Sequence, residues 1–338
     1  MPEATGLPAG TPAWSGTAVL ADRGRVVHEE SAGSADGPGS TPCGPRLRFQ
    51  AASVGKQVLS VVALALQERD RLHVAEPIAR WLPGLPRGFG AITLHHLLTH
   101  TAGTGHWADL PGWGPGAGPP AADALPALTV EAGLATAPGT SWRYSGPGFA
   151  LAARVLEAAA GERYRDLVAG LVLVPAGMAS TTSGRFPPGW ADAAAGHRGG
   201  HRVPVDPGWT RIPGSGDLWT TAEDLLRYAR ALRSGRLLDP GTAAALWEPH
   251  VRLPVPATTA STTADAYGCG TFLGRVGGRP AWFVPGDNPG YRSLLAHPRG
   301  GDADLVVLSN DEGPGLDDAV GRALRPFADP AGPGVSAR

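Results

Sequence analysis

Lysine is almost absent from this chain. Of its 338 residues 29 are Lys or Arg, and Lys56 is the single lysine among them. A composition rich in Ala, Gly, Pro and Arg is typical of a GC-rich coding sequence, which uses arginine wherever a positive charge suffices. The lysine that remains indicates a task for a desolvated amine, because an ammonium can release its proton whereas a guanidinium stays charged. The alternative is a surface lysine retained by chance.

Other features are also missing, and each absence excludes a class of function. The net charge is -1 and 17% of the residues are charged, so there is no basic excess for binding nucleic acid or an anionic membrane surface. Cys43 and Cys269 are too few for a metal site or a disulfide framework, although one disulfide between them stays open. No apolar run reaches about 20 residues, and the N-terminus lacks the pattern of a secretory signal. We expect a cytoplasmic protein with no membrane, nucleic-acid, metal or cofactor partner.

Ser53 lies three residues before Lys56, and an apolar stretch of helical length, VLSVVALALQ, follows the lysine. Residues i and i+3 share one face of a helix, so the hydroxyl and the amine can touch. The N-terminus of a helix also offers free N–H groups that favour developing negative charge. The pattern predicts an activated serine with a neighbouring base and an oxyanion donor. An ordinary helix cap is the alternative for Ser53, since a lone Ser-x-x-Lys often arises by chance.

Strand-like and helical patterns follow one another in an order that predicts an α+β fold. Two short strands are expected around an Asp-Arg-Gly turn within 17–27, and four strand-like runs lie between 268 and 310. Most of the helical patterns fall between these regions. This order predicts an antiparallel sheet built from both chain ends, flanked by helices and interrupted by an inserted, mainly helical region.

The chain is expected to form a single catalytic unit with two subdomains. An α/β subdomain covers about 16–75 and 205–328. A helical subdomain covers about 76–204. Residues 329–338 are expected to be a disordered tail.

Six segments extend the Ser-x-x-Lys signal along the chain. In order they are FQAASVGKQ, ITLHHLLTHTAG, PGTSWRYSGPGFALAARVLE, GSGDLWTTAEDLLRYARAL, YGCGTFLG and VPGDNPGYRSLLA. Together they resemble the serine β-lactamase and penicillin-binding-protein superfamily, in the branch of class C β-lactamases, DD-peptidases, esterases and transacylases. The similarity runs from about residue 17 to 310, and six ordered segments are far more specific than any single motif. The resemblance implies a β-lactamase-like fold.

The resemblance also implies the roles of four residues. Ser53 would be the acylated nucleophile, and Lys56 would be its base or proton partner. Tyr144 would be the tyrosine of the second motif, which exchanges protons with Ser53 and Lys56. The backbone N–H groups of Ser53 and Asp287 would form the oxyanion hole. Which of Lys56 and Tyr144 takes the serine proton is left open, because the two titrations are coupled.

Two departures from the family pattern bear on the substrate. Gly146 stands where the second motif has the Asn that binds a substrate amide. Val284 stands where the third motif has the Lys or His that helps to hold the carboxylate of penicillins and peptides. Both changes argue against penicillin and D-Ala-D-Ala as natural substrates. They are typical of the esterase and transacylase members of the branch.

Further substrate-binding residues are expected near these motifs. Trp107 and Trp142 fall in segments that border the site in relatives, and an aromatic cleft suits a bulky acyl group. Gly286, Asn288 and Arg292 belong to the third-motif strand or follow it closely. The alternative is that the tryptophans are core residues and that the charged side chain is solvated.

The sequence therefore predicts a serine-dependent acyl-transfer enzyme, an esterase or a transacylase of amide-forming type. A small-molecule ester, thioester or amide would acylate Ser53, and water or a second acceptor would resolve the acyl-enzyme. We expect such a reaction to belong to a biosynthetic pathway. The alternative enzyme is a D-amino-acid amidase, a DD-peptidase or a weak β-lactamase, with Arg292 holding a carboxylate. A non-catalytic binding module on the same fold is the other class considered. The oligomeric state is left open.

Overall fold

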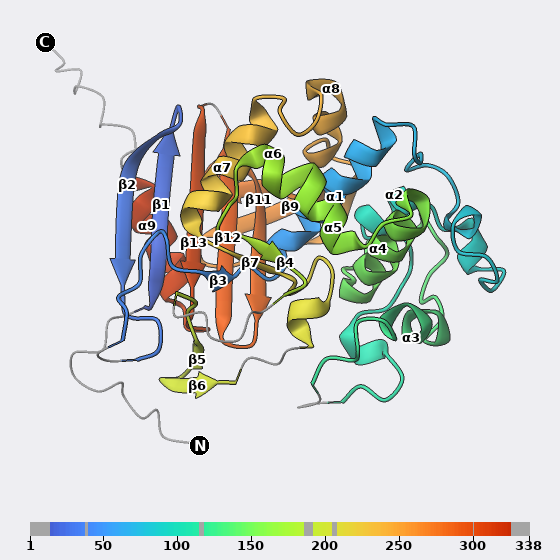
Figure 1. Cartoon of the computed structure of the whole chain (residues 1–338), viewed down its shortest axis with the longest axis horizontal. Helices are drawn as coiled ribbons and strands as arrows, with labels where there is room; N and C mark the ends of the chain where they lie inside the picture. Colours follow the sequence, from blue (N-terminus) through green and yellow to red (C-terminus); the bar gives the residue numbers. More distant parts are fainter. Residues whose placement is uncertain are drawn as a thin grey trace, which may run out of the picture.

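An antiparallel sheet of eight strands joins the two ends of the chain (Figure 1). The computed structural model describes residues 14–37, 40–114, 118–185, 192–204, 208–299 and 301–325. The strand order is β2-β1-β13-β12-β11-β10-β9-β8. These strands are β1 (Gly16–Asp22), β2 (Arg25–Ala32), β8 (Val251–Thr258), β9 (Thr262–Tyr267), β10 (Phe272–Val276), β11 (Arg279–Asn288), β12 (Tyr291–Pro298) and β13 (Ala303–Ser309). The α+β prediction of a sheet built from both ends is confirmed, because β1 pairs with β13 from Gly16↔Ser309 to Asp22↔Ala303.

Helices cover both faces of this sheet, so β13 is buried along its whole length. Side chains alternate between faces along a strand. Val306 and Leu308 accordingly join one core with residues of α1 (Val54–Gln67) and α7 (Ala222–Arg233). Leu305 and Val307 join the opposite core. That second core includes α9 (Gly315–Ala323).

Helix α1 confirms the helix expected from the apolar run after Ser53. All but one of its 14 residues are buried. A helix that is apolar on every side is a core helix rather than an amphipathic surface helix. It packs against β11 and β12 on one side and against α4 (Gly146–Ala160) and α5 (Tyr164–Val168) on the other. The nucleophile motif is thus anchored in the centre of the larger core.

The inserted helical region lies at the end of the sheet away from β1 and β2 (Figure 1). Besides α4 and α5 it contains short helices: η1 (Ile78–Arg80), η2 (Phe89–Ala91), α2 (Leu94–Leu98), η3 (Trp107–Asp109), α3 (Leu125–Glu131), η4 (Ala169–Leu173) and α6 (Val174–Ala176). Its helices end at Ala176, earlier than the boundary near 204 that we expected. The division into subdomains stays a prediction, and residues 329–338 lie outside the described ranges.

Short strands and turns complete the fold between the insertion and the large sheet. Strand β7 pairs with two segments far from it in sequence, which local patterns do not reveal. The remaining elements are β3 (Phe49–Gln50), β4 (Thr182–Ser183), β5 (Gly196–Arg198), β6 (His201–Val203), η5 (Trp209–Arg211), β7 (Leu218–Thr220), α8 (Pro240–Ala243) and η6 (Ala244–Leu246). Cys43 and Cys269 are free and buried, so they form no disulfide. Within the described ranges, no helix has the length and apolar character needed to cross a bilayer.

Candidate active site

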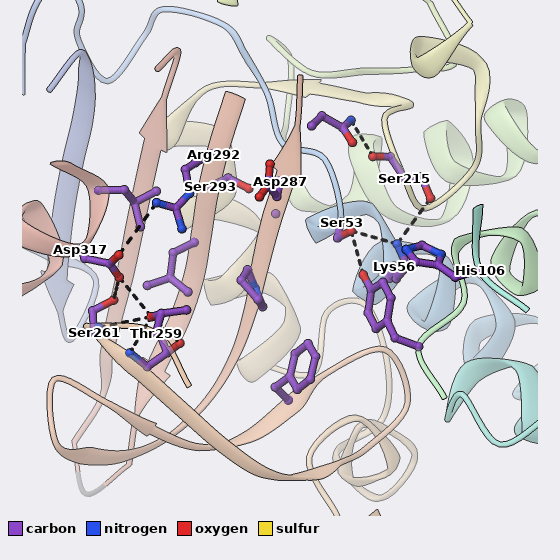
Figure 2. A pocket seen from close by; sticks show the side chains of 18 of the residues that line it. Ser53, Lys56, His106, Ser215, Thr259, Ser261, Asp287, Arg292, Ser293 and Asp317 are labelled. Carbon is purple, nitrogen blue, oxygen red and sulfur yellow. Dashed lines mark hydrogen bonds and ion pairs between the residues drawn. The ribbon is translucent and has the colours of Figure 1, made fainter. Parts of the chain in front are cut away.

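A cleft of about 410 Å³ opens where the N-terminus of α1 meets strand β11 and the helical insertion (Figure 2). Three sequence-predicted catalytic side chains, Ser53, Lys56 and Tyr144, line it together. They come from segments about 90 residues apart in the chain, which the fold brings into direct contact. The cleft is therefore the candidate active site.

Ser53 stands at the first turn of α1, but its side chain does not cap the helix. The residue before it, Ala52, is buried and has φ +47°, a left-handed conformation that alanine rarely adopts. The Ser53 Oγ accepts hydrogen bonds from Lys56 Nζ (2.9 Å) and from Tyr144 Oη (2.8 Å). The ordinary cap considered for this serine is excluded, since the hydroxyl bonds to the two groups predicted to exchange protons with it.

Lys56 is almost completely buried, with 1% of its surface exposed. Its Nζ donates to Ser53 Oγ, to Gly214 O (2.7 Å) and to Ser215 Oγ (3.4 Å). Three acceptors match the three N–H groups of an ammonium, which is the arrangement that a buried charge requires. The ring of Tyr144 lies 5.0 Å from Nζ. Lys56 is thus a site residue and not a surface lysine retained by chance.

Asp217 supports this arrangement from behind, and sequence reasoning missed it. Its carboxylate accepts hydrogen bonds from Gly214 N (2.8 Å) and from Ser183 Oγ (2.7 Å). It thereby fixes the turn that presents Gly214 O and Ser215 Oγ to the lysine. Complete burial raises the pKa of Asp217 to about 6, against the opposing effect of its hydrogen bonds. The only sequence signal was its position in the shared segment GSGDLW, to which no role was attached.

Tyr144 is held in place by the residues around it. Ser145, the next residue, caps α4 through a hydrogen bond from Gly148 N to its Oγ (2.9 Å). The His100 ring lies 4.3 Å from that of Tyr144, and His100 Nδ1 accepts from Ser145 N (3.1 Å). Complete burial lowers the pKa of His100 well below its ordinary value. His100 is therefore a neutral supporting residue.

Gly286 allows strand β11 to pass directly against the turn before Ser53. A Cβ at this position would lie 2.5 Å from Ala51 O and 2.2 Å from Ser293 Oγ, closer than real contacts permit. Ser293 Oγ also donates to Ala51 O (2.8 Å). This close approach brings Asp287 to the cleft wall beside Ser53. The oxyanion hole of Ser53 N–H and Asp287 N–H stays a prediction.

Two residues predicted to bind substrate, Val284 and Gly146, are not among the residues that line the cleft. Val284 is buried in the core that contains α1, because alternation along β11 turns its side chain inward. Gly146 is also buried, and a Cβ there would lie 2.4 Å from Cζ2 of the Trp107 indole. The role of Gly146 is to leave room for that indole.

The other predicted binding residues do line the cleft (Figure 2 draws most of the lining). Trp107 and Trp142 contribute to the wall on the side of the insertion. Asn288 uses its amide to donate to Gln50 Oε1 and Ser215 O, both at 2.8 Å, so it holds neighbouring segments together. Arg292 donates to Gly313 O (3.3 Å).

The far end of the cleft is polar, which no sequence pattern indicated. Asp317, on α9, lies 3.9 Å from Arg292 and accepts hydrogen bonds from Thr259 Oγ1 (3.1 Å) and Ser261 Oγ. These groups come from three separate elements, so no local motif joins them. Among the described residues, no group of three or more His, Cys, Asp or Glu is placed to hold a metal ion.

Comparison with known proteins identifies the family of the chain. The family model described as Beta-lactamase matches residues 12–328. The chain belongs to the Beta-lactamase family. It is similar to esterase EstB of Burkholderia gladioli, at 30% identity in an alignment of 266 residues that covers 67% of this chain and 67% of EstB. It is also similar to PbpX of Bacillus subtilis, provisionally named a penicillin-binding protein, at 26% identity over 88% of this chain and 71% of PbpX.

Solved structures show the same fold. The D-amino acid amidase of Ochrobactrum anthropi SV3 superposes with a TM-score of 0.79, at 22% identity and over 93% of each chain. The predicted family and β-lactamase-like fold are confirmed. The family members are serine hydrolases, and this Beta-lactamase family protein is an enzyme of that class.

Proposed function

We propose that this enzyme transfers acyl groups from a small-molecule ester or thioester through a covalent intermediate on Ser53. The observation that carries the proposal is the position of Ser53 Oγ, which bonds to both Lys56 Nζ and Tyr144 Oη. A nucleophile within hydrogen-bond distance of a base, and fixed by a third group, is the arrangement of covalent catalysis by serine.

The contacts of Lys56 favour Tyr144 as the group that moves the proton. All three N–H groups of the Lys56 ammonium have acceptors, so the lysine serves as a fixed cation. Tyr144 takes the Ser53 proton while Oγ bonds to the acyl carbon, and it passes its own hydroxyl proton to the leaving group. The carbon–oxygen or carbon–sulfur bond to the leaving group breaks, and the protonated leaving group departs. Water or a second acceptor repeats the sequence in reverse and releases the acyl group.

The residues around the nucleophile favour a donor whose acyl group carries no carboxylate. The third-motif position that is basic in relatives is the buried Val284, which offers no cation to the cleft. Trp107, Trp142 and Phe272 provide an aromatic lining for an apolar chain. Small molecules are the proposed partners, as acyl donor and as acceptor. Acyl transfer in a biosynthetic reaction and plain hydrolysis both remain within the proposal.

Arg292 favours a second candidate, an amidase for D-amino acid derivatives. Its guanidinium lines the cleft, and among the described residues its side-chain contacts are long, to Gly313 O (3.3 Å) and to Asp317 (3.9 Å). It is therefore available to a substrate carboxylate. The D-amino acid amidase of Ochrobactrum anthropi shares the fold.

Intact-protein mass spectrometry after brief exposure to acyl donors tests the proposal. The panel holds p-nitrophenyl esters of short and long acids, an acyl thioester, a D-amino acid amide and a penicillin. We expect an ester or thioester adduct on the wild-type protein and on Ser234→Ala, a serine replacement at the end of α7. Ser53→Ala should form no adduct and lose at least about 10³-fold in turnover, the scale of removing a catalytic nucleophile. Equal turnover by Ser53→Ala would overturn the assignment.

A further inference from the structure

His106 lines the cleft beside the catalytic residues, although the reaction proposed above does not use it. Its ring lies edge-on to that of Tyr144, with 5.6 Å between ring centres (Figure 2 shows the ring near Lys56). The segment that carries it is fixed by Asp109, whose Oδ2 accepts from His106 N (2.6 Å). Arg143 in turn donates to both oxygens of Asp109, at 3.0 and 2.8 Å.

The hydrogen bonds of the imidazole define which nitrogen carries the proton. His106 Nδ1 accepts from Gly146 N (3.2 Å), so in the neutral ring the hydrogen is on Nε2. No residue in the described ranges accepts a hydrogen bond from Nε2. Burial, together with the charge of Lys56, lowers the pKa of His106 to about 4. The ring is therefore a neutral donor at neutral pH and cannot take up a proton without losing its bond to Gly146.

Gly146 and Trp107 complete this arrangement. The Trp107 indole occupies the space that a side chain at position 146 would need, so residue 146 contributes no polar group to the cleft. The Trp142 indole N–H, on the same wall, is buried and lacks a hydrogen-bond partner among the described residues, so it does not face the cleft. His106 Nε2–H thus lies on an otherwise aromatic wall next to the acylation site.

We infer that His106 Nε2–H binds a hydrogen-bond acceptor in the acyl chain, a few atoms from the scissile carbonyl. The inference rests on the proposed acyl transfer and narrows its substrate class to acyl groups that carry an amide, keto or ether oxygen there. His106 is in this view a specificity residue and not a base. A donor that finds no acceptor is left unpaired in the complex, so a purely aliphatic acyl chain is disfavoured.

A matched pair of esters isolates this contact. The p-nitrophenyl esters of N-acetylglycine and pentanoic acid have acyl chains of equal length, and only the first has an amide. The quantity measured is the ratio of kcat/KM for the amide ester to kcat/KM for the pentanoate. Differences in intrinsic reactivity cancel when the ratio of a variant is divided by that of the wild type.

Two variants of the same residue give opposite expectations. His106→Leu keeps the bulk and removes the donor, so the ratio should fall about threefold to tenfold, the scale of one neutral hydrogen bond. His106→Gln should restore most of the ratio, because a carboxamide can accept from Gly146 N and also donate. Thermal unfolding of both variants checks that each is folded.

The outcomes separate this inference from the proposed function. If the wild-type enzyme turns over both esters and the ratio is unchanged in His106→Leu, the donor role is wrong while acyl transfer stands. Equal slowing of both esters with accumulation of the acyl-enzyme would make His106 a deacylation residue and also overturn the inference. Absence of any Ser53 adduct or turnover in the wild type would overturn both.

Discussion

The two walls of the cleft differ in how firmly hydrogen bonds and burial hold their polar side chains. On the helical wall, the hydroxyl of Ser53 and the amine of Lys56 have two and three hydrogen bonds, and Lys56 is buried. On the sheet wall, Arg292 has one long hydrogen bond and one ion pair at 3.9 Å. The helical wall fixes the positions of atoms that must react. On the sheet wall, the side chain of Arg292 is held loosely, so its replacement should disturb the structure little.

This difference explains which family features the chain keeps. A shift of about 1 Å in a reacting group reduces rate strongly, so the nucleophile, cation and tyrosine stay together. On the sheet side, the third-motif position that is basic in relatives is the buried Val284. The chain therefore keeps the contacts of Ser53, Lys56 and Tyr144 while it departs from the family pattern at a position outside them.

The largest effect is expected on the helical wall, for Lys56→Arg. A guanidinium is planar and longer, so it cannot place one nitrogen among Ser53 Oγ, Gly214 O and Ser215 Oγ. We expect kcat/KM for the preferred ester to fall about 10²- to 10⁴-fold, the scale of disabling acid–base catalysis, because Ser53 and Tyr144 lose the cation that is fixed between them. Steady-state kinetics, with folding checked by circular dichroism, provides the measurement.

The control for this exchange is Arg154→Lys, which interchanges the same two residues on the exposed surface of α4. Its kinetics should equal those of the wild type. Full activity in a folded Lys56→Arg protein would mean that the positive charge alone suffices, and that the helical wall is no stricter than the sheet wall.

An intermediate effect, on stability, is expected from Asp217→Asn behind the helical wall. The pKa of Asp217 is raised to about 6 in the fold, mainly by burial, whereas an exposed aspartate has a pKa near 3.9. An acid with a raised pKa contributes stability below its unfolded pKa and loses that contribution as pH rises through the folded value. The difference in unfolding free energy between wild type and variant should therefore shift against the wild type by about 3 kcal/mol from pH 3.5 to pH 7.

Urea unfolding at several pH values measures this shift. The variant lacks the titrating group, so other ionisations cancel in the difference. A difference that does not vary with pH would show that the pKa of Asp217 is the same in the folded and the unfolded protein. Burial would then not raise the pKa of this carboxyl group.

The smallest effect is expected on the sheet wall, for Arg292→Ala. Its ion pair is long and partly exposed, so stability should change by less than about 1 kcal/mol. For neutral p-nitrophenyl esters we expect kcat/KM to stay within about threefold of the wild-type value, since an unengaged cation contributes little to binding. A loss above tenfold with a neutral ester would remove the contrast between the walls. A large loss confined to a carboxylate-bearing amide would favour the amidase candidate.

The sequence predicted what depends on ordered motifs and local periodicity. The apolar run placed α1, the motif order predicted that Ser53, Lys56 and Tyr144 would meet, and the strand-like ends predicted the sheet. It failed where the direction of a side chain or the space beside it decides the outcome. To predict that Val284 faces the core, one must know which residues of β11 point inward. To predict that Gly146 is buried, one must know that the Trp107 indole, from another segment, lies against it. Asp217 and His106 each accept a hydrogen bond from a backbone N–H group, and such bonds leave no mark in residue spacing.

The pairing of β1 with β13 has a consequence for synthesis of the protein. The second strand of this pair leaves the ribosome only after almost all the rest of the described chain, and contacts of such large sequence separation form slowly. Until then the apolar surface of α1 lacks its cover from β11 and β12. The nascent chain therefore carries Ser53 on an apolar helix that lacks part of its cover until the last third of the chain is made, and exposed apolar surface of this kind is prone to aggregate.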